Sequence, residues 1–265
     1  AMLLAQSSTD RDRDHSARLC ISPASPEQLR AFEARFGVHV VTTYGLTEGM
    51  LNIMNPADRR TRRVGAVGRP IAPGVQRVRI VDPKGWDLPA GVTGEIVLQS
   101  PAQMVGYYKD PEATARALRD GWLYTGDLGW LDEDGFLYFV GRLKEMIRRG
   151  GENIAPGEVE ATLLMHPKVA EAVVLGVPDP IYEEAIKACV VLHPGESPAT
   201  VPPEALFAHC AARLAPFKVP RYLEYREELP RTPTLRVQRH LLTQVTSGEN
   251  GPVFDRFAMK GESVP

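Results

Sequence analysis

The first fifty residues have the hydrophobic spacing of one helix followed by one strand. Apolar residues recur at helical intervals from 29 to 36, Ser25 precedes them as a candidate N-cap, and Gly37 follows as a candidate terminator. An apolar run over 38–42 then predicts a strand. The polar and glycine residues of 44–49 predict a tight turn at the carboxyl end of that strand, where open α/β sheets gather ligands.

Between residues 65 and 141 the pattern changes to short alternating runs separated by glycine and proline, which is typical of antiparallel strands. One helix interrupts them, with Asp110 as N-cap and Pro111 in its first turn, and it is expected to end near Asp120-Gly121. The segment therefore predicts a β-rich, barrel-like subdomain. Its expected strands are 77–81, 95–99 and 136–140.

From residue 146 to 246 helices and strands alternate, as in a small α+β domain of ordinary size. The residues from 247 to 265 have no periodicity, so a loose tail is expected there. The expected elements are a strand through 147, a helix over 156–165, strands over 172–177 and 185–192, a helix over 202–214, a strand over 222–225 and a last short helix.

Composition favours a folded globular protein and excludes several other classes. Of the 265 residues, 43% are hydrophobic and 24% charged, and the formal net charge is -2, so nothing global favours nucleic acid or an anionic membrane. No apolar run reaches membrane-spanning length, and the start lacks the order of a signal peptide. The three cysteines lack metal or redox spacing, which favours a reducing, cytoplasmic location.

Candidate chemistry lies in short motifs whose order along the chain is more informative than any one of them. They are Tyr44-Gly45-Leu46-Thr47-Glu48, Gly94-Glu95-Ile96, Gly106-Tyr107-Tyr108, Tyr124-Thr125-Gly126-Asp127, Gly141-Arg142-Leu143-Lys144-Glu145, Arg149-Gly150-Gly151-Glu152-Asn153-Ile154 and Leu214-Ala215-Pro216-Phe217-Lys218-Val219-Pro220. In this order and spacing they resemble the adenylate-forming (AMP-dependent) acyl-CoA synthetase superfamily, from about residue 17 to 242. Segments 148–154, 173–188 and 217–220 look most similar to crotonobetaine/carnitine–CoA ligases and their bacterial relatives.

The resemblance implies an α/β fold with a large N-terminal domain and a small, mobile C-terminal α+β domain. Residues 1–141 would be a remnant of the large domain, 142–145 a hinge at Lys144, and 146–246 the small domain. The family's Gly/Ser/Thr-rich phosphate loop has no counterpart in the sequence, so the chain is expected to be the C-terminal part of a larger enzyme, without its N-terminal half. Lost sheet neighbours would leave apolar edges around 38–42 exposed.

ATP activation of a carboxylate needs donors for phosphate oxygens and an acidic side chain for Mg²⁺. Thr47 and Glu48, adjacent in the sequence, supply the hydroxyl and the Mg²⁺ carboxylate. The resemblance places Tyr44 beside the adenine, with Gly45 next to it at the nucleotide. The alternative for the Thr-Glu pair is a helix cap.

Three further residues complete the adenylation site that the resemblance implies. It places Asp127 and Arg142 at the ribose, for which an Asx turn and a solvated charge are the alternatives. Arg236 occupies the position of a catalytic lysine that reaches the reacting carboxylate and α-phosphate. Arginine keeps the charge but is bulkier and forked, so the exchange is not conservative at a catalytic point charge. The alternative is that Arg236 only solvates the last helix.

Coenzyme A is the second nucleotide that the resemblance implies. Glycines let a pantetheine chain pass close to the backbone, and aromatic rings stack on adenine. Core packing is the alternative for Phe217. The matching positions are Arg148, Gly150 and Gly151 in the segment that swings toward the adenylate, Tyr182 and Phe217 against the adenine, and Lys218 and Arg221 for phosphate.

The expected activity is therefore an AMP-forming acid–thiol ligase. A carboxylic acid and ATP would give an acyl adenylate and pyrophosphate, and CoA would then displace AMP to give acyl-CoA. This chain alone is expected to be inactive or impaired. Two alternatives stay open: an adenylation domain that loads a carrier-protein thiol, and a non-catalytic remnant that binds AMP or CoA.

Overall fold

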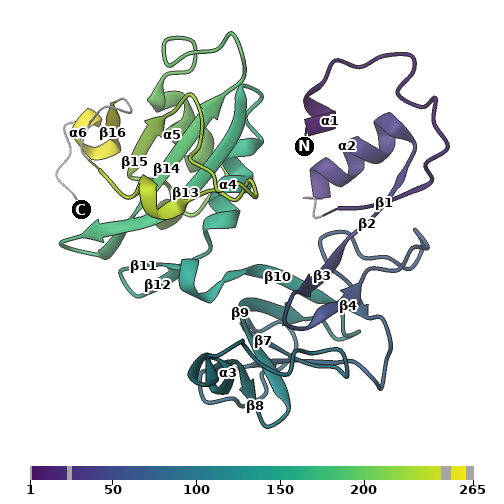
Figure 1. Cartoon of the computed structure of the whole chain (residues 1–265). Coiled ribbons are helices and arrows are strands. Elements are labelled where there is room, and N and C mark those ends of the chain that lie inside the picture. The colour runs from purple at the N-terminus through teal and green to yellow at the C-terminus, as the bar shows by residue number, and fades with distance from the viewer. Residues whose placement is uncertain (1, 23–25, 246–251, 261–265) are drawn as a thin grey trace. The chain divides into compact units, whose positions relative to one another are not determined.

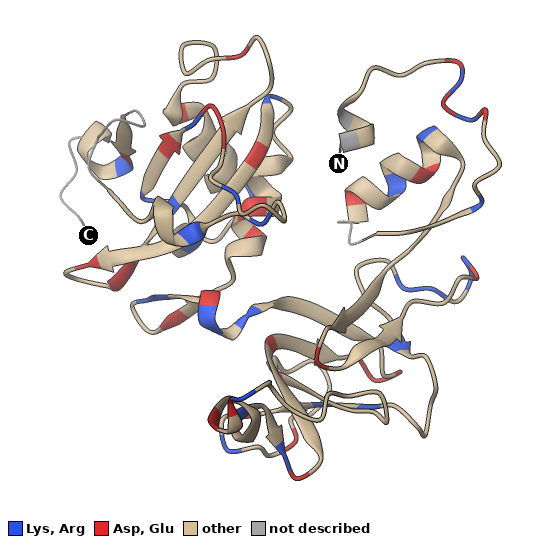
Figure 2. Cartoon of the chain, in the orientation of Figure 1, with Lys and Arg blue, Asp and Glu red and all other residues tan. Residues whose placement is uncertain are grey.

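The computed structural model describes residues 2–22, 26–245 and 252–260. The chain forms two compact units, Ala1–Leu143 and Lys144–Pro265, each described by itself below (Figure 1). Their division falls inside the segment 142–145, whose role as a hinge stays a prediction. Basic and acidic residues are interspersed in both units (Figure 2). In the part of the chain that the structure describes, no helix is long and apolar enough to cross a membrane.

The first unit begins with helices and a two-stranded parallel sheet. The elements are α1 (Met2–Ala5), β1 (Leu19–Ile21), α2 (Pro26–Phe36) and β2 (His39–Val41), and β1 pairs with β2. The predicted helix and strand are confirmed, with Gly37 at φ 71° after the last residue of α2. The predicted cap Ser25 lies outside the described residues.

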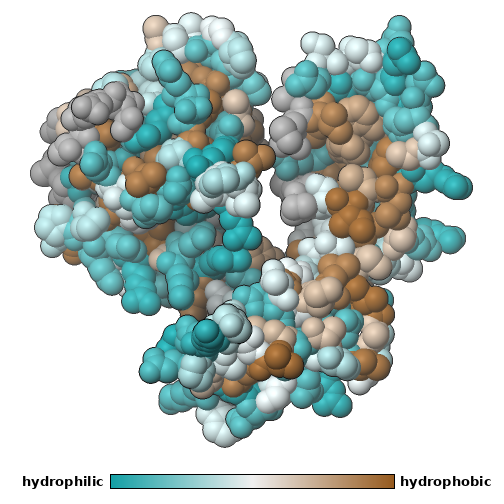
Figure 3. All heavy atoms as spheres, in the orientation of Figure 1, coloured by the Kyte–Doolittle hydropathy of each residue, from teal (hydrophilic) through white to brown (hydrophobic). Residues whose placement is uncertain are grey.

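The exposed apolar edge of this sheet is β1, which corrects the prediction for 38–42. The side chains of β2 are buried, whereas Leu19 and Ile21 of β1 are 50% and 56% exposed. The reason is that β2 packs against α2, and Thr42 beyond it donates a hydrogen bond to the carbonyl of Ala66. Figure 3 shows hydrophobic atoms at the surface of this part of the chain.

A three-stranded antiparallel sheet follows and corrects the turn predicted over 44–49. Its strands are β3 (Thr43–Leu46), β4 (Met50–Met54) and β5 (Arg69–Pro70), in the order β3-β4-β5. Only 47–49 form the turn between β3 and β4. Gly45 permits the close pairing, because a Cβ there would lie 2.6 Å from the carbonyl oxygen of Met50 on the facing strand.

The rest of the first unit is the predicted antiparallel subdomain. Its sheet has the order β10-β9-β7-β6, and β8 also pairs with β9. Strands β6, β7 and β10 correspond to the three predicted strands, whereas β9 is absent from the prediction. The strands are β6 (Arg77–Val81), β7 (Gly94–Gln99), β8 (Leu118–Arg119), β9 (Trp122–Leu131) and β10 (Leu137–Arg142).

Helix α3 (Pro111–Ala117) starts as predicted and ends earlier. The Asp110 side chain accepts a hydrogen bond from the backbone N–H of Ala113, which confirms the predicted N-cap. The helix stops before Leu118, which already belongs to β8. Asp120 and Gly121, at φ 49° and 80°, form the short turn between β8 and β9 instead of the helix end.

The second unit is a mixed sheet in the order β12-β11-β14-β15-β16, with β13 also paired to β14. Among the described strands of this sheet, only β14 and β15 pair in parallel. Its elements are η1 (Leu143–Glu145, shared with the first unit), β11 (Ile147–Arg149), β12 (Glu152–Ile154), α4 (Pro156–Leu164), β13 (Val169–Asp179), β14 (Glu183–Leu192), α5 (Pro203–Ala211), η2 (Pro216–Lys218), β15 (Tyr222–Tyr225), η3 (Arg239–Leu242), β16 (Val253–Asp255) and α6 (Arg256–Lys260).

Alternating side chains of the long hairpin β13–β14 supply two cores, one on each face of the sheet. Val174 and Ile186 pack on one face with residues of α4 and α5. Val173 and Cys189 pack on the other face with Leu242 of η3. The predicted α+β arrangement is thus confirmed, although α5 ends at Ala211 and the last short helix is a 3-10 turn.

The chain from 252 to 260 is not a loose tail, which corrects the prediction for that part of 247–265. β16 pairs with the edge of β15, and Phe254 faces Leu223 in the register. Phe257 of α6 is buried at 6% exposure. The sequence does not predict β16, because a strand of three residues is too short to show a hydrophobic period.

Candidate active site

Thr47 and Glu48 lie on the tight turn that joins β3 to β4. The backbone carbonyl of Glu48 accepts a hydrogen bond from the N–H of Met104 at 2.7 Å, and its Oε1 accepts one from the Tyr107 hydroxyl at 3.0 Å. Thr47 is exposed and Glu48 is half-buried. The helix-cap alternative for this pair is wrong, since no helix follows, and a hydroxyl and a carboxylate are left side by side on a fixed turn.

Asp127 lies in the middle of β9 and is only 5% exposed. Its Oδ2 accepts a hydrogen bond from the Tyr44 hydroxyl at 2.9 Å, and its Oδ1 is 3.4 Å from Nε of Arg142, the residue opposite it on β10. The Asx-turn alternative is therefore wrong. Three residues predicted separately meet in one cluster, from which the Arg142 side chain extends at 59% exposure.

Gly126 explains how a buried carboxylate is presented within a strand. It adopts φ 68°, and the register between β7 and β9 shifts at this point, as in a β-bulge. Its N–H donates to Oε1 of Glu95 at 3.0 Å, and the Thr125 hydroxyl donates to the carbonyl of Ile96 at 2.7 Å. The sequence signal was a Gly-Asp pair inside an otherwise strand-like run.

Tyr44 is largely buried. Its ring is 8% exposed and packs in the core with Ile53 and Leu123, and its expected place beside the adenine stays a prediction. Burial, reinforced by the nearby Asp127 charge, raises the pKa of the Tyr44 hydroxyl far above its usual value, and the hydroxyl stays a donor. Phe139, 45% exposed with its ring centroid 6.1 Å from that of Tyr44, is the aromatic residue here that the sequence analysis missed.

The residues predicted for CoA partly converge in the second unit. Gly150 and Gly151, at φ 59° and 85°, form the turn between β11 and β12, and the N–H of Gly150 donates to the carbonyl of Tyr182 at 3.1 Å. The Arg149 guanidinium lies 4.6 Å from the Tyr182 ring centroid and donates to the carbonyl of Phe217 at 3.4 Å. Arg149, which links Tyr182 to Phe217, is missing from the predicted site.

The two predicted phosphate ligands of CoA differ in availability. Nζ of Lys218 lies 2.7 Å from a carboxylate oxygen of Glu158 at a partly exposed position. Arg221, at 14% exposure, is paired with Asp179 at 2.6 Å and with Asp255 at 3.0 Å. These two ion pairs give Arg221 a structural role, and its expected phosphate contact stays a prediction.

Arg236 lies on an exposed loop three residues before η3, so its catalytic role and the alternative of a merely solvated charge both stay predictions. Its N–H donates to the Thr232 hydroxyl at 3.1 Å, and its carbonyl accepts from the N–H of Thr232 at 2.8 Å. Arg239, just beyond the loop, donates to the carbonyl of Val174 at 2.6 Å and pairs with Glu160 at 2.8 Å. The loop therefore has a fixed base and an exposed tip.

The predicted adenylation residues are divided between the units. Thr47, Glu48 and Asp127 belong to the first unit, and Arg236 belongs to the second. Lys144 and Arg148 are exposed, and the contact described for Arg148 runs from its N–H to Oε2 of Glu184 at 2.6 Å.

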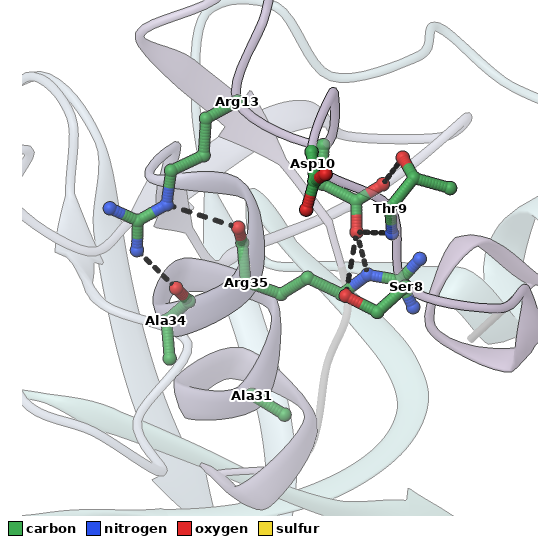
Figure 4. Close-up of a pocket in the computed structure, with 8 residues that line it drawn as sticks. Ser8, Thr9, Asp10, Arg13, Ala31, Ala34 and Arg35 are labelled. Carbon is green, nitrogen blue, oxygen red and sulfur yellow. Dashed lines mark hydrogen bonds and ion pairs between the residues drawn. The ribbon is translucent and has the colours of Figure 1, made fainter.

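A cleft beside α2 is lined by other residues (Figure 4). Nε of Arg35 contacts Asp12 at 2.6 Å, and Nε of Arg13 donates to the carbonyl of Arg35 at 3.2 Å. Since Arg35 also donates to the carbonyls of Gln6 and Ser7, its charge and donors serve the local fold.

Family models match both units. The model of the AMP-binding enzymes matches residues 1–108, and the model of the AMP-binding enzyme C-terminal domain matches residues 158–235. The chain is 47% identical over 227 residues to the sulfoacetate–CoA ligase of Cupriavidus necator, covering 84% of this chain and 43% of that protein. It is 43% identical over 235 residues to the crotonobetaine/carnitine–CoA ligase of Citrobacter koseri, covering 86% and 44%.

Solved structures agree with these matches. ATP-bound MatB from Rhodopseudomonas palustris superposes with a TM-score of 0.77 at 33% identity, covering 87% of this chain and 45% of that one. The o-succinylbenzoate CoA synthetase of Bacillus subtilis, in complex with its acyl-adenylate intermediate, gives a TM-score of 0.77 at 32% identity, covering 88% and 47%. The chain thus spans less than half the length of the relatives it matches. With the predicted resemblance confirmed in both units, the chain belongs to the AMP-binding, adenylate-forming enzymes.

Proposed function

We propose that the chain is part of an ATP-dependent acyl-CoA synthetase. A carboxylate oxygen attacks the α-phosphorus of ATP and releases pyrophosphate, and the CoA thiol then attacks the acyl carbon and releases AMP. The relatives reported above, several of them CoA ligases, support this reaction. The observation that carries the proposal is the buried Asp127 carboxylate between Tyr44 and Arg142.

In the first unit, Asp127 accepts hydrogen bonds from the ribose hydroxyls of the nucleotide. The Tyr44 hydroxyl orients one carboxylate oxygen, and Arg142 offers its exposed guanidinium at the same place. The exposed side chain of Phe139 and the exposed backbone of Gly45 provide surface beside the base. Thr47, exposed on its turn, donates its hydroxyl to a phosphate oxygen.

The donor set fits Mg²⁺ that is bound together with a nucleotide. Among the described residues no group of three or more His, Cys, Asp or Glu side chains could hold a metal ion by itself. Mg²⁺ is commonly held by one or two carboxylates and the substrate phosphates, and Glu48 supplies such a carboxylate. When bound, the ion neutralises phosphate charge as pyrophosphate leaves.

In the second unit, the proposed CoA site is built from the Gly150-Gly151 turn, Tyr182 and Phe217. The positive-φ glycines let a ligand approach the backbone, and the two aromatic residues are joined through Arg149. Phe217 also packs against the core as a partly buried residue, and in this proposal its remaining exposed surface contacts the adenine. Lys218 can bind a phosphate when its ammonium group leaves its partly exposed partner, the carboxylate of Glu158.

Arg236 and Lys144 have proposed roles outside these two clusters. Arg236, on its loop, stabilises negative charge on the reacting carboxylate and α-phosphate. Lys144 lies at the division between the units and acts in the hinge, where backbone rotation rather than side-chain chemistry matters. The reducing cytoplasm is the proposed location, and the three free cysteines agree with it.

Because the chain spans less than half the length of its relatives, we propose that turnover needs the remaining part of the enzyme. The test is AMP and acyl-CoA formation from ATP and CoA, with sulfoacetate, carnitine, crotonobetaine, anthranilate and o-succinylbenzoate as acids. It compares this chain with a fusion behind the unmatched N-terminal part of the sulfoacetate–CoA ligase, with and without Asp127→Asn.

Acyl-CoA formation by the fusion, lost in Asp127→Asn, is the expected result and identifies the acid. Formation of the acyl adenylate without transfer of the acyl group to free CoA would instead favour the loading of a carrier-protein thiol. Binding of AMP or CoA without turnover in either protein would favour the non-catalytic alternative and overturn the proposal.

A further inference from the structure

The Gly106-Tyr107-Tyr108 motif has no task in the reaction described so far, yet it contacts the proposed Mg²⁺ carboxylate. The Tyr107 hydroxyl donates to Oε1 of Glu48 at 3.0 Å across 59 positions of sequence. Three residues earlier, the N–H of Met104 donates to the Glu48 carbonyl at 2.7 Å. The segment 104–107 therefore fixes both the backbone and the side chain of Glu48.

Tyr107 is itself fixed by α3. Its N–H donates to the Thr114 hydroxyl at 2.8 Å, and that hydroxyl donates to the carbonyl of Asp110 at 2.8 Å. Gly106 is required for this approach, because a Cβ there would lie 2.9 Å from Cγ2 of Thr114. The position of the tyrosine hydroxyl is thus set by the capped helix, not by a flexible loop.

We propose that Tyr107 is a positioning residue for Glu48: its hydroxyl holds Oε1 and so aims the other carboxylate oxygen at the cation that accompanies ATP. The proposal rests on the proposed function of Glu48. A carboxylate ligand with one oxygen hydrogen-bonded to a fixed donor has a single orientation, so less freedom is lost when a cation binds.

The protonation state of Tyr107 agrees with this role. Partial burial, together with the hydrogen bond to Glu48 and its charge, raises the pKa of the Tyr107 hydroxyl above its ordinary value. The hydroxyl therefore remains a donor at neutral pH.

The chain offers a matched pair of substitutions for the test. Tyr107→Phe removes the hydroxyl and keeps the ring, whereas Tyr108→Phe makes the same change at the adjacent, 88% exposed residue. The measurement is Mn²⁺ binding to the 265-residue chain at saturating ATP, by electron paramagnetic resonance, with Mn²⁺ as the probe for Mg²⁺. We expect about tenfold weaker Mn²⁺ binding in Tyr107→Phe, the usual scale for losing an orienting partner of a ligand. Tyr108→Phe should leave Mn²⁺ affinity unchanged.

A double-substitution cycle separates positioning from general destabilisation. In the Glu48→Ala background, Tyr107→Phe should weaken Mn²⁺ binding no further, because the group that it orients is gone. An equal loss in both backgrounds overturns the proposal, as does unchanged Mn²⁺ affinity in Tyr107→Phe. Wild-type chain that binds ATP but no Mn²⁺ would instead overturn the role of Glu48.

Discussion

Asp127 shows most directly how a single residue is prepared for a ligand. Its carboxylate is nearly buried but paired through both oxygens. Asp127→Asn should weaken AMP binding about tenfold to a hundredfold, since a hydrogen bond to a charged group contributes about 1.5–3 kcal/mol. Calorimetric titration of the chain with AMP measures this. Asp134→Asn, an exposed change in the same subdomain, is the control, and equal AMP affinities would contradict the ribose assignment.

For single residues, the sequence predicts which residue types belong to the candidate site better than it predicts the contacts that these residues make. Motifs in the sequence mark Asp127 and Glu48, and the resemblance to the family marks Tyr182, as candidate site residues. The bond from Tyr44 to Asp127 joins positions 83 apart, and the link from Arg149 to Phe217 joins positions 68 apart. No local pattern encodes such distant pairs. The two carboxylate partners of Arg221 are likewise distant in sequence, so no local pattern predicts its ion pairs.

The attachment of α2 to β2 depends on one carboxylate. Glu33 accepts two hydrogen bonds from Arg62, at 2.7 and 2.8 Å, and one from the N–H of Val40 at 2.8 Å. Burial alone would raise its pKa, but these donors and the Arg62 charge outweigh it and lower the pKa from 4.5 to about 2.

A depressed folded-state pKa stabilises the fold above the unfolded-state value and loses that effect as pH falls. The free energy of unfolding should therefore decrease by up to about 3 kcal/mol from Glu33 as the pH drops through the window from 4.5 to 2. Denaturant titrations at several pH values should show a shallower decrease in Glu33→Gln. The same slope in both proteins would contradict this.

In the second unit a buried ion pair joins β14, β15 and η3. Lys187 and Glu224 are 2.6 Å apart with 0% and 4% of their side chains exposed, and Lys187 also donates to the carbonyl of Leu242 at 2.9 Å. Lys187→Met should cost about 3 kcal/mol, because Glu224 keeps only one of its two cationic partners, Arg226 at 2.8 Å, and the buried carbonyl of Leu242 loses its donor. The surface pair of Lys168 with Glu196 gives the control, where Lys168→Met should cost about 1 kcal/mol or less. Urea unfolding measures both, and similar losses would be the contrary result.

Elements were predictable where a local rule defines them. Asp110-Pro111 marked the start of α3, and alternation gave β6 and β15 with their observed bounds. β9 was missed because Gly126 and Gly129 interrupt its alternation, although cross-strand pairing on both sides keeps it extended. The predicted turn at 44–49 is longer than the observed one, because residues 44–46 belong to β3. Gly45 allows the facing strand β4 to approach closely, and this pairing can be seen only in the folded structure.

For the whole chain, the division at Leu143 and Lys144 predicts independent unfolding. Each unit has its own hydrophobic core. Scanning calorimetry should resolve two transitions, and Lys187→Met should lower only the one that belongs to the second unit. Limited trypsin digestion should cut at the exposed Arg142 or Lys144 and leave two resistant fragments. A single transition displaced as a whole by Lys187→Met would contradict this organisation.

The pairing of β16 with β15 makes the chain sensitive to where its coding sequence stops. A premature stop codon just before Val253 would remove Asp255, leaving Arg221 with one carboxylate, and would leave β15 unpaired on one side at Tyr222, Leu223 and Glu224 while its other side stays paired with β14. An unpaired strand edge of this kind recruits other chains. Such a truncated gene product would therefore be lost to aggregation although every motif residue of the enzyme family were still encoded.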